Sequence, residues 1–156
     1  MIENFNIIPG KGVGNVLLGM KASEVEEILG TPDDKEVLEY DDGENSITLY
    51  YFDLQIDLTF ESDDDDRLSF ISVENEKFSI AGKVKIGQTK EEVKNYCKAL
   101  SYSEPELEDM SSDDVPNQEL LSYDAENINF WFTDNELDEI QIGPFWKDDE
   151  TPIWPA

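Results

Sequence analysis

The segment that decides the fold is GMKASEVEEILGTP, at residues 19–32. Its apolar residues have the spacing of one helix face: Val25, Ile28 and Leu29. Ser23 and Glu26 have the spacing of a capping box, which marks a helix start. Gly30 and Pro32 mark the end, because glycine favours the left-handed cap and proline cannot continue a helix. The segment therefore predicts a short amphipathic helix with one buried stripe.

The same pattern recurs later in the chain. Residues 18–29, LGMKASEVEEIL, align with residues 86–97, IGQTKEEVKNYC, and Val25 then matches Val93. In the second stretch, Thr89 and Glu92 again have capping-box spacing. A repeated helix signal at a constant offset is typical of a chain that uses one structural unit twice.

Alternating apolar and polar residues follow each predicted helix. Residues 56–60, IDLTF, match 128–132, INFWF, and residues 68–73, LSFISV, match 137–142, LDEIQI. A period of two predicts half-buried strands. The sequence thus predicts an α+β fold of two tandem helix-plus-antiparallel-sheet repeats, with the helices packed on one sheet face. The first unit would span residues 1–78. The second would span 79–156 with a C-terminal tail, and the two would form one compact domain.

Residues 19–32 also resemble a family signature. They are similar to the G-M-(T)-x-x-E-V-x-x-x-L-G-x-P pattern of the SmpA/OmlA outer-membrane assembly lipoproteins, with Lys21 where those proteins usually have threonine. The segment resembles equally the superfamily of the β-lactamase inhibitor protein, in which a helix-plus-sheet unit occurs in tandem. The resemblance implies a binding scaffold more than a chemistry.

The charge balance excludes several classes of function. The 156 residues include 38 acids and 11 bases, for a formal net charge of −27, and there is no histidine and one cysteine. We therefore expect no Ser-His-Asp or Cys-His catalysis, no histidine-ligated zinc and no cysteine cluster. A surface this negative repels nucleic acid and anionic membranes. With no secretory signal or apolar run of about 20 residues, we expect a cytoplasmic protein.

The outward positions of the predicted strands are the first candidate binding site. If Ile56 and Ile128 face the core, alternation turns a set of aromatic and acidic residues outward: Asp57, Glu61, Phe70, Trp131 and Glu139. Aromatic residues with polar surroundings are typical of the energetic centres of interfaces. Phe70 and Trp131 are thus predicted to form an exposed patch bordered by acids. The alternative is that a loop, the tail or the other half of the chain covers them.

Acidic loops are the second candidate. One cluster contains Asp41 and Asp42, and another, within residues 101–119, contains Asp113 and Asp114. The run at residues 63–66 consists of four aspartates, and is interpreted as a solvated hairpin turn rather than a calcium site. The glycine-rich residues 9–14 are interpreted as a turn rather than a phosphate loop. Residues 145–155 are too aromatic for a free tail and are expected to pack on the body.

These observations predict a binding protein and not an enzyme, with no cofactor and no bound metal. The leading hypothesis is an acidic immunity or inhibitor protein that neutralises a basic bacterial toxin or enzyme, since opposite charge accelerates encounter. One alternative is a cell-envelope assembly or scaffold protein, as the family resemblance implies. A further alternative is a Ca²⁺-binding module at the aspartate run. The oligomeric state and the identity of the partner stay open.

Overall fold

The computed structural model describes residues 1–155, and its secondary structure is mostly β. Strands account for 43% of the residues and helices for 14%. The elements, in chain order, are β1 (Asn6–Ile8), β2 (Gly12–Val13), β3 (Val16–Leu17), α1 (Ala22–Leu29), β4 (Asp34–Glu39), β5 (Asn45–Tyr51), β6 (Ile56–Glu61), a 3-10 turn (Ser62–Asp64), β7 (Arg67–Val73), β8 (Ser79–Ile80), β9 (Val84–Lys85), α2 (Lys90–Ala99), β10 (Glu106–Asp109), β11 (Gln118–Tyr123), β12 (Ile128–Thr133), β13 (Glu136–Ile142), β14 (Phe145–Trp146) and β15 (Pro152–Ile153).

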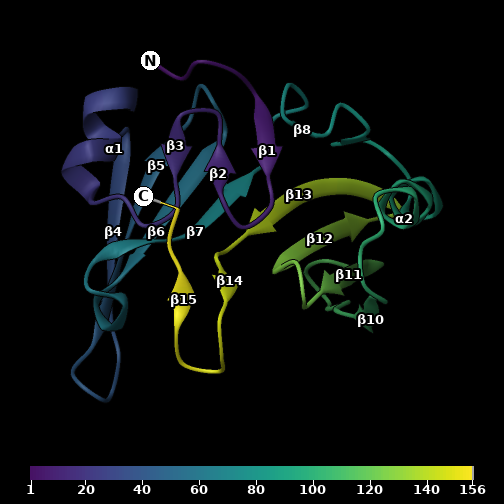
Figure 1. Ribbon diagram of the computed structural model, residues 1–156. Helices are drawn as coiled ribbons and strands as arrows, with labels where there is room; N and C mark the ends of the chain where they lie inside the picture. Colours follow the sequence, from purple (N-terminus) through teal and green to yellow (C-terminus); the bar gives the residue numbers. More distant parts are fainter. Residues whose placement is uncertain (156) are drawn as a thin grey trace.

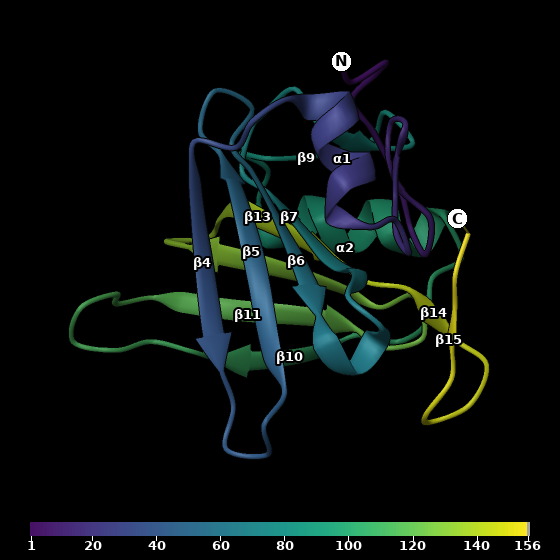
Figure 2. The ribbon, with the colours of Figure 1, turned by 90° about the vertical axis from the view of Figure 1, so that its left-hand side faces the viewer.

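One curved sheet of eight strands dominates the molecule (Figure 1). Its order is β10-β11-β12-β13-β7-β6-β5-β4, and every neighbouring pair is antiparallel. The two halves of the chain meet at its centre, where β13 pairs with β7 and Ile140 lies opposite Val73. The strands at the two ends of the sheet run in clearly different directions, as expected from strand twist (Figure 2).

The predicted fold class is therefore wrong. Within residues 1–155 the chain does not form two separate helix-plus-sheet repeats, because it is mostly β, its two helices are short, and strands of both halves join into one large antiparallel sheet. A second sheet, which the sequence analysis did not predict, contains five strands in the order β3-β2-β1-β8-β9. In it β1 pairs in parallel with β8, so this sheet also joins residues from both halves.

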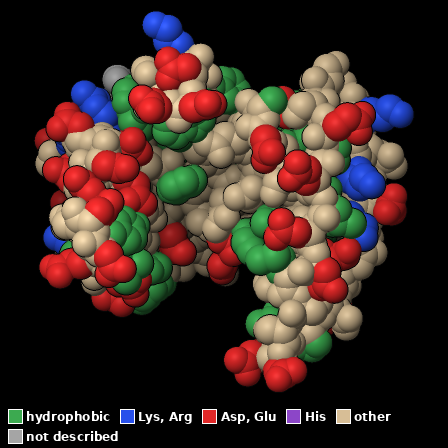
Figure 3. Space-filling view, turned by 90° about the horizontal axis from the view of Figure 1, so that it is seen from below, with side chains coloured by type: hydrophobic (Ala, Val, Ile, Leu, Met, Phe, Trp, Pro, Cys, Tyr) green, Lys and Arg blue, Asp and Glu red, His purple; other side chains and the backbone are tan. Residues whose placement is uncertain are grey.

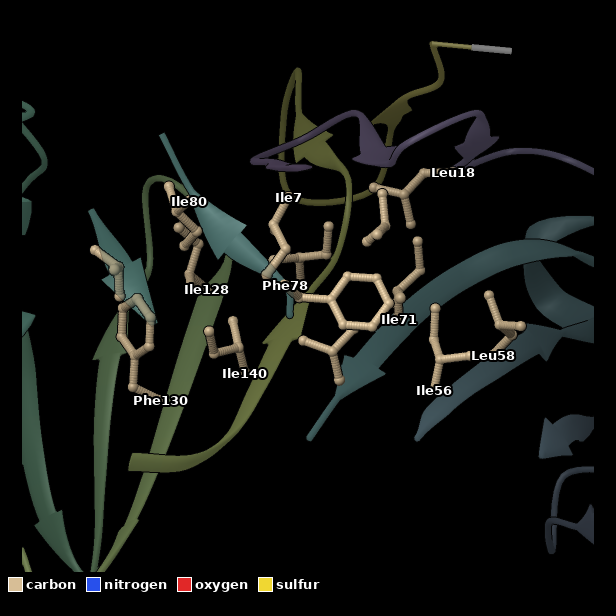
Figure 4. Packing of buried hydrophobic residues seen from close by; sticks show 14 of the residues in the cluster. Ile7, Leu18, Ile56, Leu58, Ile71, Phe78, Ile80, Ile128, Phe130 and Ile140 are labelled. Atoms are coloured by element: carbon tan, nitrogen blue, oxygen red, sulfur yellow. The ribbon is translucent and has the colours of Figure 1, made fainter. Parts of the chain in front are cut away.

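The core is a single cluster that draws on both sheets and both helices. It includes Ile7 of β1, Val25 of α1, Val93 and Cys97 of α2, and the inward residues of the large sheet. Phe78, in the connection between β7 and β8, lies among Ile7, Ile71 and Ile140 (Figure 4). The helices and the five-stranded sheet contribute to one face of the large sheet, and within residues 1–155 no such layer covers its other face (Figure 2).

Two of the three predicted helix boundaries are confirmed. In α2, Thr89 Oγ1 accepts a hydrogen bond from the Glu92 amide, and Glu92 accepts one from the Thr89 amide, as predicted. Gly30 ends α1 at φ +85°. The predicted Ser23–Glu26 box is wrong: α1 begins after Lys21, whose amide donates to Glu24 Oε1. Neither helix of residues 1–155 is long and apolar enough to cross a membrane.

The two ends of the C-terminal segment contact the body, as expected, whereas residues 146–151 between them are exposed. Strands β14 and β15 form a hairpin, and Pro144 bridges to Gly10. The Phe145 ring lies over Gly10, where an added Cβ would be 2.6 Å from the ring. The Trp154 side chain lies against Gly19, where an added Cβ would be 3.1 Å away. Two glycines thus provide the surface on which the aromatic hairpin segment rests.

Replacing Gly10 with alanine is expected to lower the free energy of unfolding by about 3 kcal/mol, because strain at φ +73° and a clash with the Phe145 ring add together. Gly82→Ala is the matched control: it has φ +68° and no neighbour within 4 Å of an added Cβ. We expect that variant to lose about 1 kcal/mol. Urea unfolding of both variants measures the difference. Equal losses would contradict the packing of Phe145 on Gly10.

Candidate functional site

The open face of the large sheet carries a hollow, which we call the open-face hollow. Its volume is about 430 Å³. Its walls come from strands of both halves, and are lined by Thr48, Tyr50, Asp57, Thr59, Phe70, Ser72, Asn129, Glu139 and Gln141. Each of these side chains alternates with a buried neighbour in its strand, so the period of two that builds the core also builds the hollow. The site therefore exists only because β7 and β13 pair.

A hydrogen-bond chain fixes one wall of the hollow. The Trp131 indole Nε1 donates to Gln141 Oε1 at 2.9 Å. Gln141 Nε2 in turn donates to Glu139 Oε2 at 2.9 Å, and the Ser72 hydroxyl also donates to that oxygen. The chain holds the Glu139 carboxylate in one orientation. Trp131 is thus a half-buried support of the wall rather than part of an exposed aromatic patch.

The hollow combines an exposed aromatic ring with desolvated carboxylates. The Phe70 side chain is 45% exposed, so a partner could bury the rest of its ring. Burial, and then the charge of Glu139, raises the pKa of Asp57 above its usual value. Burial, followed by the charges of Glu139, Asp57 and Asp138, likewise raises the pKa of Glu74, which comes just after β7. Asp57 and Glu139 therefore lie in the hollow, and Glu74 lies beside it, in a neighbouring hollow that Asp138 also lines.

The other predicted site residues lie elsewhere. Glu61, at the end of β6, accepts a hydrogen bond from the Tyr40 hydroxyl at 3.3 Å. Burial raises its pKa; the Tyr40 bond opposes this, and Asp63 and Asp64 add to it. Glu61 does not line the open-face hollow. It belongs to a second, smaller group of acids at the turn between β6 and β7.

The loop acids are fully exposed and separate from the hollow. Asp41 and Asp42 lie in the turn between β4 and β5, where Asp42 Oδ1 accepts a hydrogen bond from the Glu44 amide at 3.0 Å. Asp113 and Asp114 lie in the connection between β10 and β11. These four residues extend the negative surface at both ends of the sheet. The structure does not bring them to the residues of the open face.

Six of the lining residues were not predicted as site residues: Thr48, Tyr50, Thr59, Ser72, Asn129 and Gln141. The outward alternation of their strands was the available signal. Apart from Tyr50, they are uncharged polar side chains without an aromatic group, so residue type alone does not mark them as site residues. Their contribution depends on pairing between strands, since Ser72 and Gln141 lie opposite each other only in the assembled sheet.

Basic residues do little to offset the acids within residues 1–155. Two ion pairs form there, Lys21–Asp65 at 3.3 Å and Lys90–Glu119 at 3.0 Å. From below, the molecule is hollowed between two lobes, acidic side chains surround the hollow, and the visible Lys and Arg side chains lie near the outline (Figure 3). The face that remains open is therefore an unneutralised acidic surface.

The two weaker motifs lie in connections between strands. The glycine-rich residues 9–14 form the turn after β1 and the two-residue strand β2, with Gly10 and Gly14 among the glycines at positive φ. The aspartate run forms the connection between β6 and β7, where Asp64 accepts a hydrogen bond from the Ser69 hydroxyl at 2.8 Å. No group of three or more His, Cys, Asp or Glu side chains that could hold a metal ion is found in residues 1–155.

In comparisons with known proteins, no family model, curated protein or solved structure matches the chain.

Proposed function

We propose that this chain is an acidic protein-binding module, an immunity or inhibitor protein that neutralises a basic bacterial toxin or enzyme. The observation that carries the proposal is the open-face hollow, an uncovered sheet face with an exposed phenylalanine and unneutralised carboxylates. We place this role in the cytoplasm, where an immunity protein would meet the toxin made by its own cell.

Charge supports the choice of a basic partner. A net charge of −27 opposes folding through self-repulsion and favours a positively charged ligand over long distances. Such attraction can raise association rates to about 10⁸–10⁹ M⁻¹s⁻¹ at low salt. An enzyme that holds phosphate groups has a positive site, so an acidic face that covers it would block the reaction directly.

The fixed wall of the hollow supports specific binding beyond charge. The Trp131–Gln141–Glu139 chain orients the polar groups before a partner arrives, which reduces the entropy lost on binding. Phe70 offers apolar area at the centre, surrounded by polar side chains. A desolvated aromatic residue within a polar rim is typical of an interface in which a few residues supply most of the affinity.

The test combines co-purification with matched tryptophan variants. We expect the protein, isolated from its natural host at 50 mM salt, to carry a basic protein whose activity it abolishes. Trp131→Ala should weaken that complex tenfold or more, because it removes the support of Gln141 and Glu139. Trp146→Ala, at an exposed tryptophan of the C-terminal hairpin, is the control and should bind within twofold of the original chain.

Calorimetric titration of the purified pair measures both variants, and circular dichroism checks that both are folded. The proposal fails if no basic protein binds at low salt, or if the bound protein keeps its full activity. If Trp146→Ala weakens the complex more than Trp131→Ala does, the partner does not bind at the open-face hollow, and the proposed location of the binding surface is wrong.

A further inference from the structure

The centre of the open-face hollow holds carboxylates that nothing else in the described chain neutralises. Within residues 1–155, Asp57 and Glu139 form no ion pair, and the carboxylate of Asp57 has no hydrogen-bond partner. Glu139 uses Oε2 for both of its bonds, so in the same part of the chain Oε1 is free. Hydrogen-bonding capacity for a cationic donor thus remains on both sides of the hollow.

The register sets the spacing of these groups. Asp57 of β6 lies opposite Ser72 of β7, and Ser72 lies opposite Gln141 of β13. Glu139 precedes Gln141 by two residues, so Asp57 and Glu139 lie diagonally across β7: their strands are about 10 Å apart at two strand spacings, and Glu139 is offset by two residues along β13. Ser72 is the side chain between them, and it is small. The result is a slot with the small Ser72 side chain at its base and a carboxylate on each side.

We infer that this slot receives one arginine side chain of the basic partner, whose guanidinium group donates to Asp57 on one side and to Glu139 on the other. The inference rests on the proposed function and names the chemistry that the open face recognises. A guanidinium group is planar and has donors on opposite edges, so it can bond two carboxylates at once. An ammonium group is a compact point charge and cannot span them equally well.

Phe70 adds a reason for arginine. It lies in the same hollow, two residues before Ser72 on β7, and its ring is exposed. A guanidinium stacks on an aromatic face more readily than an ammonium does, and cation–π contacts of this kind favour arginine. Phe70 and Glu139 are offset from Ser72 in opposite directions along the strands, so the ring and the two carboxylates line the same hollow around Ser72.

Arginine binding would also change the protonation of the slot. Asp57 faces Tyr50 on β5, and Glu139 on β13 and Glu74 beyond β7 are the charges nearest to it. In the free protein, burial and then Glu139 raise the pKa of Asp57. A guanidinium ion beside the carboxyl favours the charged form and lowers this pKa. Binding should therefore release protons at pH values near the raised pKa of Asp57, and should strengthen as the pH rises through that pKa.

The experiment uses the full chain and three blocked tripeptides: acetyl-Gly-Arg-Gly-amide, the lysine analogue and the neutral citrulline analogue. The readout is the indole N–H resonance of Trp131, which reports on the slot through Gln141 and Glu139. Trp131→Phe assigns that resonance among the three tryptophans. At low salt we expect the arginine peptide to bind with a dissociation constant of about 10 mM. The lysine peptide should bind at least fivefold more weakly, and the citrulline peptide should cause no saturable shift.

Matched variants separate the slot from general negative charge. Asp57→Asn should weaken arginine binding tenfold or more, and Asp113→Asn, the same change in an exposed loop, should leave it within twofold. Equal binding of arginine and lysine peptides, no saturable shift up to 100 mM, or full binding by Asp57→Asn would each overturn the inference. If one of these results is obtained but a basic protein still binds, and Trp131→Ala weakens its binding, the arginine inference is wrong and the proposed function still holds. If the arginine peptide binds as expected but no basic protein partner is found, the proposed function is wrong and the arginine site still stands.

Discussion

Replacing Phe78 with alanine is expected to lower the free energy of unfolding by about 4 kcal/mol. Its side chain is fully buried, and its ring meets Phe5 edge-on with the ring centroids 5.2 Å apart. It lies where the five-stranded sheet meets both halves of the large sheet, between Ile7 and Ile140 (Figure 4). A cavity there would remove contacts from several elements at once, and these elements cannot all collapse into it. We therefore expect one of the largest losses available to a single substitution in this chain.

Phe70→Ala is the matched control for that prediction. It removes the same ring from the opposite, open face of the large sheet, where Phe70 is 45% exposed. The expected loss is below about 1 kcal/mol, because little apolar area leaves a buried environment. Chemical denaturation of both variants, followed by tryptophan fluorescence, measures the two losses. Similar losses would show that the open face is covered in solution, and would contradict both the core assignment and the proposed binding face.

Period-two alternation was enough to predict the strands that form the centre of the large sheet. The inward residues Ile56, Leu58, Phe130 and Phe132 are all buried, and the outward residues are not. The signal is strong there because one face of each strand contacts the core and the other faces the hollow. The same alternation correctly placed Asp57, Phe70 and Glu139 on the outer face.

The parts that failed have weaker local signals. Strands β2, β3, β8 and β9 have two residues each, too few to show any period. All four residues of β10 are exposed, so its side chains do not alternate between core and solvent. Because these short strands were not predicted, the two helices made up too large a share of the predicted fold. The error in fold class follows from that, since the second sheet consists of segments that only tertiary contacts order.

Pairing between distant strands also limited the prediction of the site. In β7 and β13 the alternation changes phase, because bulges leave Ser69 and Asp138 unpaired with β6 and β12. After each bulge, the outward side chains point into the hollow. Which outward residues become neighbours depends on the contact between β7 and β13, and Ser72 and Gln141 come from opposite halves of the chain. Alternation predicts the face of a residue but not its neighbour on the next strand.

The stability of the protein is expected to fall as the pH rises from 5 to 8. Asp57, Glu61 and Glu74 have pKa values raised in the folded state, chiefly by burial. A carboxyl group with a raised pKa binds its proton more tightly in the folded chain, so folding is favoured where the proton is bound. The contribution is complete below the ordinary values of 3.8 for Asp and 4.5 for Glu, and is lost as the pH rises through the raised values.

Two other carboxyl groups, those of Asp109 and Asp148, change the stability with pH in the opposite direction, but at lower pH. Hydrogen bonds to Ser111 lower the pKa of Asp109, and bonds chiefly to Glu150 and Thr151 lower that of Asp148. Their contribution is present above the ordinary value of 3.8 and is lost only below it. The buried Cys97 thiol, with its pKa raised to about 11, stays neutral throughout the range from 5 to 8. The maximum of stability should therefore lie near pH 4 to 5.

Thermal unfolding by circular dichroism tests this sign. At low salt we expect the Tm at pH 8 to lie about 5 °C below the Tm at pH 5. Salt at 0.5 M should reduce the difference, because it screens the exposed charges. Asp57→Asn should raise the Tm at pH 8 and leave it nearly unchanged at pH 4, whereas Asp113→Asn should change neither by more than about 1 °C. A Tm that rises from pH 5 to 8 would show that the acids of the open face are already neutralised. Such a result would leave no electrostatic reason for a basic partner to bind there. The expected result would instead mean that the free protein retains an unfavourable charge arrangement at neutral pH, which a cationic partner would relieve.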